Sequence, residues 1–191
     1  ITMLIFMKIN YKIYRKYAKL ILIFTIAVLV IVLVPGIGRL AGGSRRWIDL
    51  GVIGIQPSEL AKLGIVIYVA RFIADKKDKL GSFIKGILPL LIVLGIIFAL
   101  IIVEPDLGTA VTIGATFFIL LFIAGVDINY LFFLGLGALP LLSFFILSED
   151  YRRERFFAFL DPWSDPLDTG YHIIQSLLAL GSGGIFGVGL G

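Results

Sequence analysis

The segment GSRRWIDLG, residues 43–51, carries two adjacent arginines and a tryptophan, Arg45, Arg46 and Trp47. A guanidinium group binds phosphate oxygens in pairs, and an indole ring stacks on a sugar or lies along a lipid chain. These residue types indicate recognition of a phosphorylated lipid. Membrane anchoring is the alternative, because tryptophan prefers the depth of the lipid headgroups and arginine reaches lipid phosphates there. The sequence leaves both interpretations open.

Two other segments combine a proline with acidic residues, QPSE at residues 56–59 and EPDL at residues 104–107. Both patterns start helices, because proline fits the first helical position and Asp, Glu or Ser accept from unpaired backbone N–H groups. Lys62 follows Glu59 by three residues, so the two can pair on one helix face. Charged groups at membrane depth are costly and often mark a functional site. Helix capping and a polar site therefore both remain open.

The polar stretch between residues 148 and 172 includes three arginines and, after them, three aspartates: Arg152, Arg153, Arg155, Asp161, Asp165 and Asp168. It extends the polar surface, or it is an ordinary charged loop in which two Asp-Pro pairs form turns. His172 is the only histidine, which excludes a site of several histidines within this sequence and favours a hydrogen-bonding role. The glycine-rich residues 181–191 lack the Lys-Ser/Thr of a phosphate-binding loop and predict close packing or a re-entrant turn.

The elements that position these residues are hydrophobic helices. Hydrophobic residues make up 59% of the chain and the mean hydropathy is +1.05, against about 45–50% apolar residues in soluble domains. The fold class is therefore all-α, a polytopic helical membrane protein. The absence of cysteine excludes disulfides and thiolate metal sites. The net charge of +4 is modest, and basic residues beside membrane spans set orientation, so nucleic acid is not expected as a partner.

About 20 apolar residues cross a bilayer as a helix, and we predict five such spans, at residues 20–36, 56–73, 83–103, 107–124 and 131–147. Residues 1–7 have the composition of the end of an earlier span. Residues 148–191 are expected to form a large outer loop, whose segment 172–191 is interfacial or re-entrant because six glycines follow Leu180. We expect residues 1–191 to be a single membrane domain and, because the chain begins at Ile1 within an apolar stretch, a fragment.

Basic residues near the spans predict the orientation of the chain. Five lie between residues 8 and 19 and five more between residues 71 and 85: Lys8, Lys12, Arg15, Lys16, Lys19, Arg71, Lys76, Lys77, Lys79 and Lys85. Cytoplasmic loops are enriched in lysine and arginine, so both segments are expected in the cytoplasm. Alternation then places residues 37–55, the turn at Glu104 and the residues after Ser148 outside, and the turn at Asp127 inside.

Three long motifs go beyond these general features: GSRRWIDLGVIGIQPSELAKL, VEPDLGTA and RFFAFLDPWSDPLDTGYHIIQSLLALGSGGIFGVGLG. Together, in this order and spacing, they resemble the SEDS family of shape, elongation, division and sporulation proteins, which includes FtsW, RodA and SpoVE. The resemblance covers nearly the whole chain. The segments DPWSDP and GVGLG favour the FtsW or SpoVE side of the family.

The resemblance implies an enzyme with ten spans that polymerises lipid II into glycan strands at the outer face of the bacterial inner membrane. The substrate is a disaccharide peptide linked to undecaprenyl pyrophosphate, the partner is a class B penicillin-binding protein, and membrane lipid surrounds both. The family's catalytic carboxylate belongs to a motif downstream of the glycine-rich run, so no catalytic residue is expected in this fragment and the fragment itself is expected to be inactive. No cofactor is identifiable, and a divalent cation in the complete enzyme is left open.

By matching motif, the resemblance implies a set of residues that line a cavity or bind the lipid II headgroup: Arg46, Trp47, Gln56, Glu59, Lys62, Glu104, Asp106, Arg155, Asp161, Asp165, His172, Gln175 and Ser176.

Two other functions fit parts of the sequence. A lipid II flippase would use a charged cavity to move the headgroup across the bilayer, but it needs polar groups in both leaflets or an alternating-access device. The polar residues here collect toward one face, which favours the polymerase. A scaffold of a division or elongation complex would leave Glu59 and Lys62 unexplained.

Overall fold

The computed structural model describes residues 7–41, 44–49, 54–184 and 187–189. It falls into two compact units, residues 1–133 and 134–191, which are described separately below. The prediction that residues 1–7 end an earlier span falls almost wholly outside the described residues, as does part of the predicted re-entrant run after Leu180.

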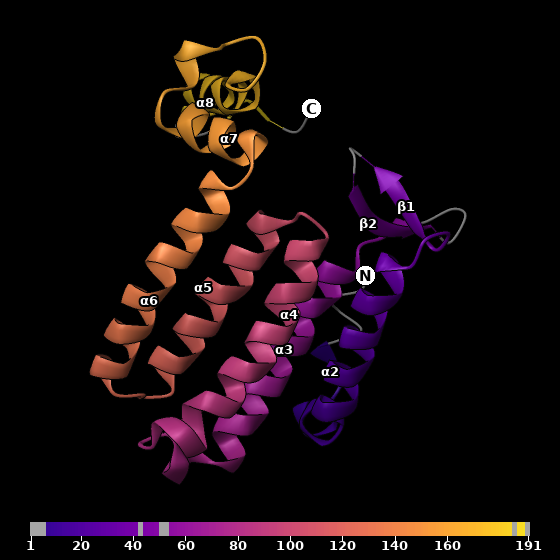
Figure 1. The fold of residues 1–191 in the computed structure, drawn as a ribbon, viewed down its shortest axis with the longest axis vertical. Helices are drawn as coiled ribbons and strands as arrows, with labels where there is room; N and C mark the ends of the chain where they lie inside the picture. The colour runs from indigo at the N-terminus through magenta and orange to yellow at the C-terminus, as the bar shows by residue number, and fades with distance from the viewer. Residues whose placement is uncertain (1–6, 42–43, 50–53, 185–186, 190–191) are drawn as a thin grey trace. The chain divides into compact units, whose positions relative to one another are not determined.

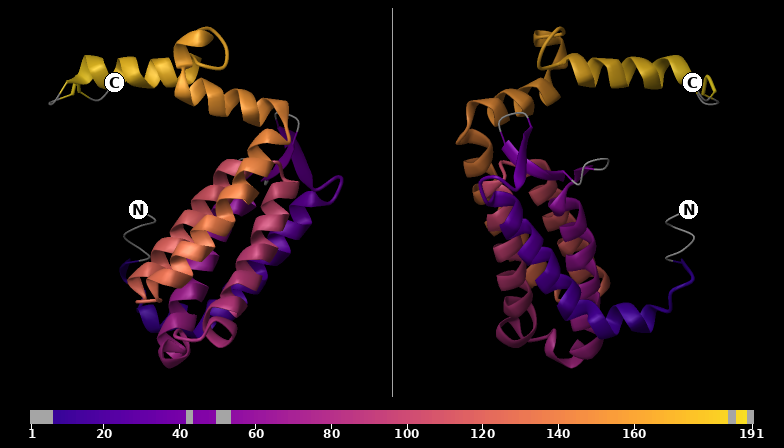
Figure 2. Two further views of the ribbon diagram at one scale, coloured as in Figure 1. Left: turned by 60° about the vertical axis from the view of Figure 1, so that its left-hand side comes forward. Right: turned by 90° about the vertical axis from the view of Figure 1, so that its right-hand side faces the viewer.

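The first unit is a bundle of helices (Figures 1 and 2). It contains α2 (Tyr11–Leu33), α3 (Pro57–Asp75), α4 (Leu88–Val103) and α5 (Leu107–Ile123), and α6 (Ile128–Leu147) begins within it. A 3₁₀ turn, η1 (Lys77–Lys79), and a π turn, η2 (Phe83–Ile87), connect α3 to α4. The five predicted spans all fall on helices, and four of them agree with the expected ends within about three residues. The prediction for the first span, residues 20–36, was wrong at its start, because α2 begins at Tyr11 and its basic first turns are helical too.

Local sequence sets the helix ends. The Asn10 side chain accepts a hydrogen bond from the backbone of Lys12 at the start of α2. Pro57 occupies the first position of α3, where its missing N–H has no intrahelical partner. The carboxylate of Asp106 accepts from the backbone N–H of Thr109 and caps α5. Side-chain capping is thus confirmed for the EPDL segment through Asp106, whereas α3 has Pro57 at its first position but no side-chain hydrogen bond that caps its start.

Apolar side chains hold the bundle together, with α2 packed along α3, α3 along α5, and α4 beside α5. Fully buried residues of this core include Leu29, Ile65, Ile101, Ile113 and Leu121. Gly64 lets α3 approach α2 closely, because a Cβ at this position would lie 2.6 Å from Thr25 Oγ1.

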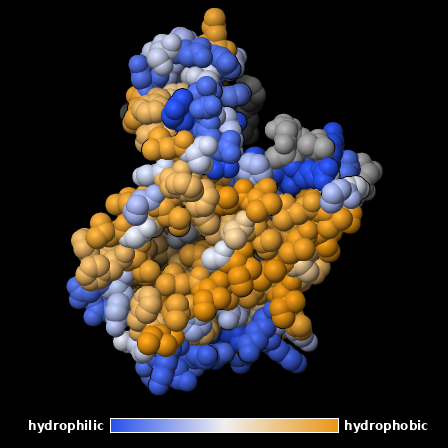
Figure 3. Space-filling model, in the orientation of Figure 1, coloured by the Kyte–Doolittle hydropathy of each residue, from blue (hydrophilic) through white to orange (hydrophobic). Residues whose placement is uncertain are grey.

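The outer surface of the bundle is also apolar (Figure 3). A hydrophobic band covers the helices, and hydrophilic residues gather at the end that holds the α3–α4 connection. Among the described residues, three helices are long and apolar enough to cross a membrane, namely Tyr11–Leu33, Phe83–Val103 and Ile128–Leu147, while α5 is apolar but shorter. These features belong to a helical membrane protein, as predicted.

One end of the bundle, the basic end, brings together the start of α2 and the end of α3. Asp75 accepts hydrogen bonds from Arg15, at 2.6 Å, and from Arg71, at 3.2 Å, and these bonds hold the pKa of Asp75 below its usual value. Phe83 and Tyr130 pack at 5.8 Å between ring centroids, so the start of α6 lies at this end too. The predicted placement of the two basic segments on one side agrees with this arrangement.

At the other end, the sheet end, three short strands form a feature that the sequence did not predict. Strands β1 (Gly38–Ala41), β2 (Ser44–Asp49) and β3 (Gly54–Ile55) pair antiparallel in the order β1-β2-β3. The described residues between Gly38 and Ile55 thus form a small sheet, whereas the other elements that the structure describes are helices and helical turns. The sheet packs against the C-terminal end of α2 and the N-terminal end of α3.

The second unit holds the rest of α6, then α7 (Asp150–Leu160), a 3₁₀ turn, η3 (Pro162–Ser164), and α8 (Tyr171–Gly183). Gly170 lies against the carbonyl of Pro162 so closely that no Cβ fits there. The turn after α7 thereby docks at the start of α8. The predicted interfacial segment is helical from Tyr171 through Gly183, including the first glycines of the run.

Candidate functional site

The site at the sheet end is built around Arg46 on β2. Its Nε donates to the carbonyl of Glu104 at 2.8 Å, and its Nη2 donates to the carbonyl of Pro105. A hydrogen bond from a charged donor is stronger than one between two neutral groups. Arg46 therefore fastens the sheet to the turn between α4 and α5, a role for which its position in the sequence gave no signal.

Gln56 and Asp106 join the two helix starts that share the proline pattern. Gln56 Nε2 donates to Asp106 Oδ2 at 3.1 Å, while the hydroxyl of Thr109 donates to the same oxygen at 2.9 Å. Asp106 thus caps α5 and ties it to the start of α3 at the same time. Two segments that are 50 residues apart are brought together, as their common placement on the outer face predicts.

Glu104 is almost completely buried, with 1% of its surface exposed, and neither carboxyl oxygen has a hydrogen-bond partner in the described part of the chain. It lies directly after the apolar helix Phe83–Val103, in the turn that Arg46 holds. Burial raises the pKa of Glu104 to about 8, the charge of Asp106 adds to the rise, and Arg46 opposes it. In this conformation the carboxyl does not reach the surface, so the expected headgroup contact of Glu104 remains a prediction.

Glu59 and Lys62 form the predicted ion pair on α3, with Nζ 2.7 Å from the carboxylate. The Glu59 side chain is 55% exposed and that of Lys62 is 35% exposed. The pair therefore lies on the surface of the bundle, where both groups can meet a ligand.

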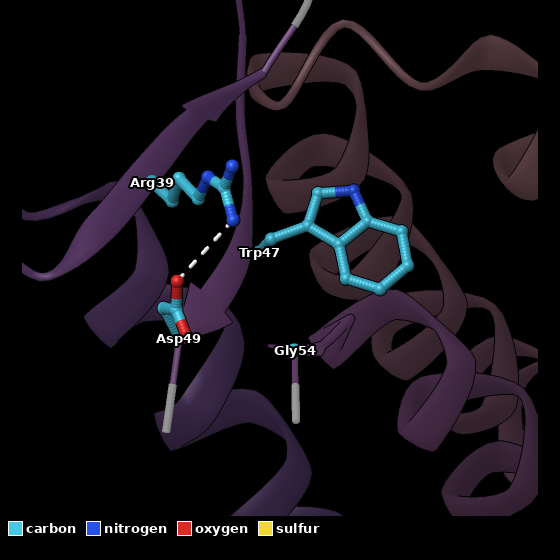
Figure 4. Close-up of a pocket in the computed structure, with 4 residues that line it drawn as sticks. All are labelled: Arg39, Trp47, Asp49 and Gly54. Carbon is cyan, nitrogen blue, oxygen red and sulfur yellow. Dashed lines mark hydrogen bonds and ion pairs between the residues drawn. The ribbon is translucent and has the colours of Figure 1, made fainter. Parts of the chain in front are cut away.

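A pocket of 160 Å³ opens beside Trp47 (Figure 4). Arg39 and Asp49 form an ion pair at 3.3 Å on one side, and Gly54 lies near the indole on the other. Trp47 is 39% exposed. The sequence analysis missed Arg39, Asp49 and Gly54, and the signal that could have found them is strand pairing, which sets Arg39 opposite Trp47.

The other candidates lie in the second unit, where most of them have local interactions. The guanidinium of Arg155 lies 5.9 Å from the ring of Tyr151, and Asp165 accepts weakly from Thr169 at 3.4 Å. The ring of His172 packs against Tyr171, and the Ser176 hydroxyl donates to the carbonyl of His172. Asp161 is the C-cap residue directly after α7, and Gln175 is exposed on α8. Their predicted role toward a headgroup stays a prediction.

Metal ligands do not gather in the described residues, where no group of three or more His, Cys, Asp or Glu side chains could hold a metal ion.

Comparison with known proteins identifies the family. The model of a family described as "Cell cycle protein", which unites FtsW, RodA and SpoVE, matches residues 1–191. The chain belongs to this FtsW/RodA/SpoVE family. A probable peptidoglycan glycosyltransferase FtsW of Geobacter sulfurreducens is 43% identical over 190 residues, 100% of this chain and 51% of the relative. Stage V sporulation protein E of Bacillus subtilis is 41% identical over 100% of this chain and 52% of the relative.

Solved structures agree with this membership. A chain from work described as "Structural coordination of polymerization and crosslinking by a peptidoglycan synthase complex" has a TM-score of 0.72 and 30% identity, over 95% of this chain and 53% of that one. The rod shape determining protein RodA of Thermus thermophilus has a TM-score of 0.58 and 30% identity, over 70% and 43%. The FtsW/RodA/SpoVE chain described here thus spans about half the length of the curated relatives it matches.

Proposed function

We propose that the complete protein containing this chain polymerises lipid II into glycan strands at the outer face of the bacterial cytoplasmic membrane. The observation that carries the proposal is the match, along the whole chain, to a relative named as a probable peptidoglycan glycosyltransferase. The same chemistry serves division, elongation and sporulation, and the similarity to FtsW and to a sporulation protein supports the first or the last.

The reaction sets the demands on the site. A sugar hydroxyl of one lipid-linked disaccharide attacks the anomeric carbon of the growing strand, so that a new C–O bond forms while the bond to pyrophosphate breaks. A carboxylate base takes the hydroxyl proton, and undecaprenyl pyrophosphate leaves with the bonding electrons. Positive charge near the leaving group stabilises the transition state. None of the described aspartates is assigned the role of the base.

The sheet end offers groups for substrate binding. Lys62 carries an exposed positive charge, and Trp47 presents an indole beside the Arg39–Asp49 pair. A sugar ring can stack on the indole while its hydroxyls bond to the charged pair. We assign the headgroup sugars to Trp47 and the pyrophosphate to Lys62.

A flippase remains the alternative. It would need polar groups along the path through the membrane, whereas the described polar clusters of the bundle gather at its two ends, and the buried core between them consists of residues such as Ile65, Ile97 and Ile113. This distribution supports the polymerase. We further propose a class B penicillin-binding protein as partner, supported by the similarity to a chain of a peptidoglycan synthase complex.

The experiment is glycan strand synthesis by the purified complete protein and its partner, with lipid II as the substrate. We expect strands with the unchanged protein and a roughly fivefold lower rate with Trp47→Ala, because an aromatic stacking contact contributes roughly 1 kcal/mol beyond the area it buries. Membrane levels should stay near normal, since Trp47 lies outside the bundle core.

Phe24→Ala is the matched control, because Phe24 is an exposed aromatic in the apolar part of α2, away from the sheet. If Trp47→Ala disappears from the membrane, Trp47 is an anchor instead. Movement of lipid II between leaflets of a vesicle without any strand synthesis would favour the flippase.

A further inference from the structure

The carboxyl of Glu104 is enclosed by the chain on all sides that the structure describes. It is 1% exposed, and both oxygens lack a donor. The hydroxyl of Ser58, at the start of neighbouring α3, is also fully buried and has no partner among the residues that the structure describes. A buried carboxylate normally has hydrogen bonds or a counter-charge. Glu104 has no hydrogen bond to offset an ionised form.

The charged groups around Glu104 come from each element packed at this end. Arg46 on β2 directs its Nε and Nη2 to the backbone carbonyls of the turn rather than to the carboxyl. Asp106, before α5, adds a second negative charge. On α3, Glu59 and Lys62 pair with each other, and α2 has no basic residue in its last turn. The surroundings therefore favour an uncharged carboxyl.

We propose that Glu104 is a positioning residue that remains protonated at neutral pH and keeps the α4–α5 turn seated against β2 and α3. The turn supplies both carbonyls that hold Arg46, and Arg46 is adjacent to Trp47 on β2. Ionisation places a charge next to Asp106 in a buried site, and this displaces the turn and with it the strand of Trp47. Glu104 thus acts on the substrate through Arg46 and Trp47.

The pKa of about 8 supports this assignment and gives the direction of the pH effect. In the folded state the proton is held more tightly than at the ordinary value of 4.5, so it contributes stability that is fully present below about pH 4.5 and is lost as the pH rises through 8. The carboxyl is therefore expected to be mostly protonated at pH 7 and mostly ionised at pH 9.

The first test uses infrared spectroscopy on the purified complete protein, which needs no activity. The band of the Glu104 carboxylic acid is identified as the one that is missing in Glu104→Gln. In the unchanged protein this band should disappear as the pH is raised, with a midpoint near pH 8. Asp106→Asn should move the midpoint to lower pH, because it removes a negative charge, while asparagine still caps a helix. Arg46→Gln should move it to higher pH. A midpoint near 4.5, or no shift in either variant, would overturn the proposal.

The second test measures strand synthesis and rests on the proposed function. Between pH 7 and pH 9 the rate of the unchanged protein should fall about tenfold more than that of Glu104→Gln, which cannot ionise. Glu149→Gln is the control, since Glu149 is exposed, and should keep the fall of the unchanged protein. If no strands form while the infrared band titrates as expected, the proposed function fails and the assignment of Glu104 stands. Equal falls in both proteins would refute the positioning role.

Discussion

Arg46 and Asp106 direct their polar groups to the protein itself, whereas Glu59 and Lys62 form an exposed pair with each other. An exposed ion pair contributes only about 0–1 kcal/mol to stability, because water screens both charges. The Glu59–Lys62 pair therefore contributes little to the fold. Its charges remain available to a headgroup, which makes it the sharper test of substrate binding.

We predict that Glu59→Gln and the double variant Glu59→Gln/Lys62→Met change the free energy of unfolding by less than about 1 kcal/mol. Both should impair strand synthesis, because the headgroup loses polar partners. Thermal unfolding in detergent and synthesis from lipid II, measured on the same preparations, separate the two effects. Full recovery of activity in the double variant would mean that the pair is only structural.

For single residues, the sequence predicts those hydrogen bonds and ion pairs whose two members are close to each other along the chain. Glu59 and Lys62 are three residues apart on a helix, so their pairing follows from helical geometry. The bond from Gln56 to Asp106 and the clamp of Arg46 depend on how distant helices pack, which no local pattern determines. For the same reason the burial of Glu104 could not be predicted, since its proline-acid pattern indicated only helix capping or a polar site.

The helices were predictable because apolar blocks of about 20 residues mark them, and proline marks the start of α3. The true start of α2 at Tyr11 was missed, although Asn10 before it is a typical capping residue. The sheet was missed because its strands are only two to six residues long and lie between two spans. Its signal was present in the two glycines between the first two strands, which often mark a hairpin. At Gly64, α2 and α3 approach so closely that a Cβ would lie 2.6 Å from Thr25 Oγ1, and no local pattern predicts such a contact.

Gly64→Ala should destabilise the bundle by about 1–3 kcal/mol, because the added Cβ would lie 2.6 Å from Thr25 Oγ1. Thr25 cannot easily move, since it is 2% exposed and its hydroxyl donates to the carbonyl of Ile21 at 2.7 Å. Thermal unfolding in detergent measures the effect. Gly95→Ala in α4 is the control, where a Cβ meets nothing within 4 Å and alanine favours the helix. Equal stability of the two variants would refute close packing at Gly64.

The bundle as a whole has two chemically different ends. Its basic end carries the lysines and arginines of residues 8–19 and 71–85, and its sheet end carries Trp47 and the network of Arg46, Gln56 and Asp106. The apolar band between the ends is suited to lipid (Figure 3). Loops rich in lysine and arginine usually lie on the cytoplasmic side, so the basic end is expected there. The sheet end is then expected on the outer side of the membrane, where the headgroup of the proposed substrate would lie.

Cysteines introduced separately at Ser44 and Lys77 test this orientation in the complete protein, after any cysteine outside residues 1–191 is replaced by serine. Residues 1–191 contain no cysteine, so each label then reports one site. Ser44 begins β2 at the sheet end, and Lys77 lies in the exposed turn after α3 at the basic end. With intact cells, an impermeant thiol reagent should label Ser44→Cys, while Lys77→Cys should react only after the membrane is opened. Labelling of both from the same side would contradict the predicted topology, and with it the assignment of Trp47 to a headgroup on the outer face.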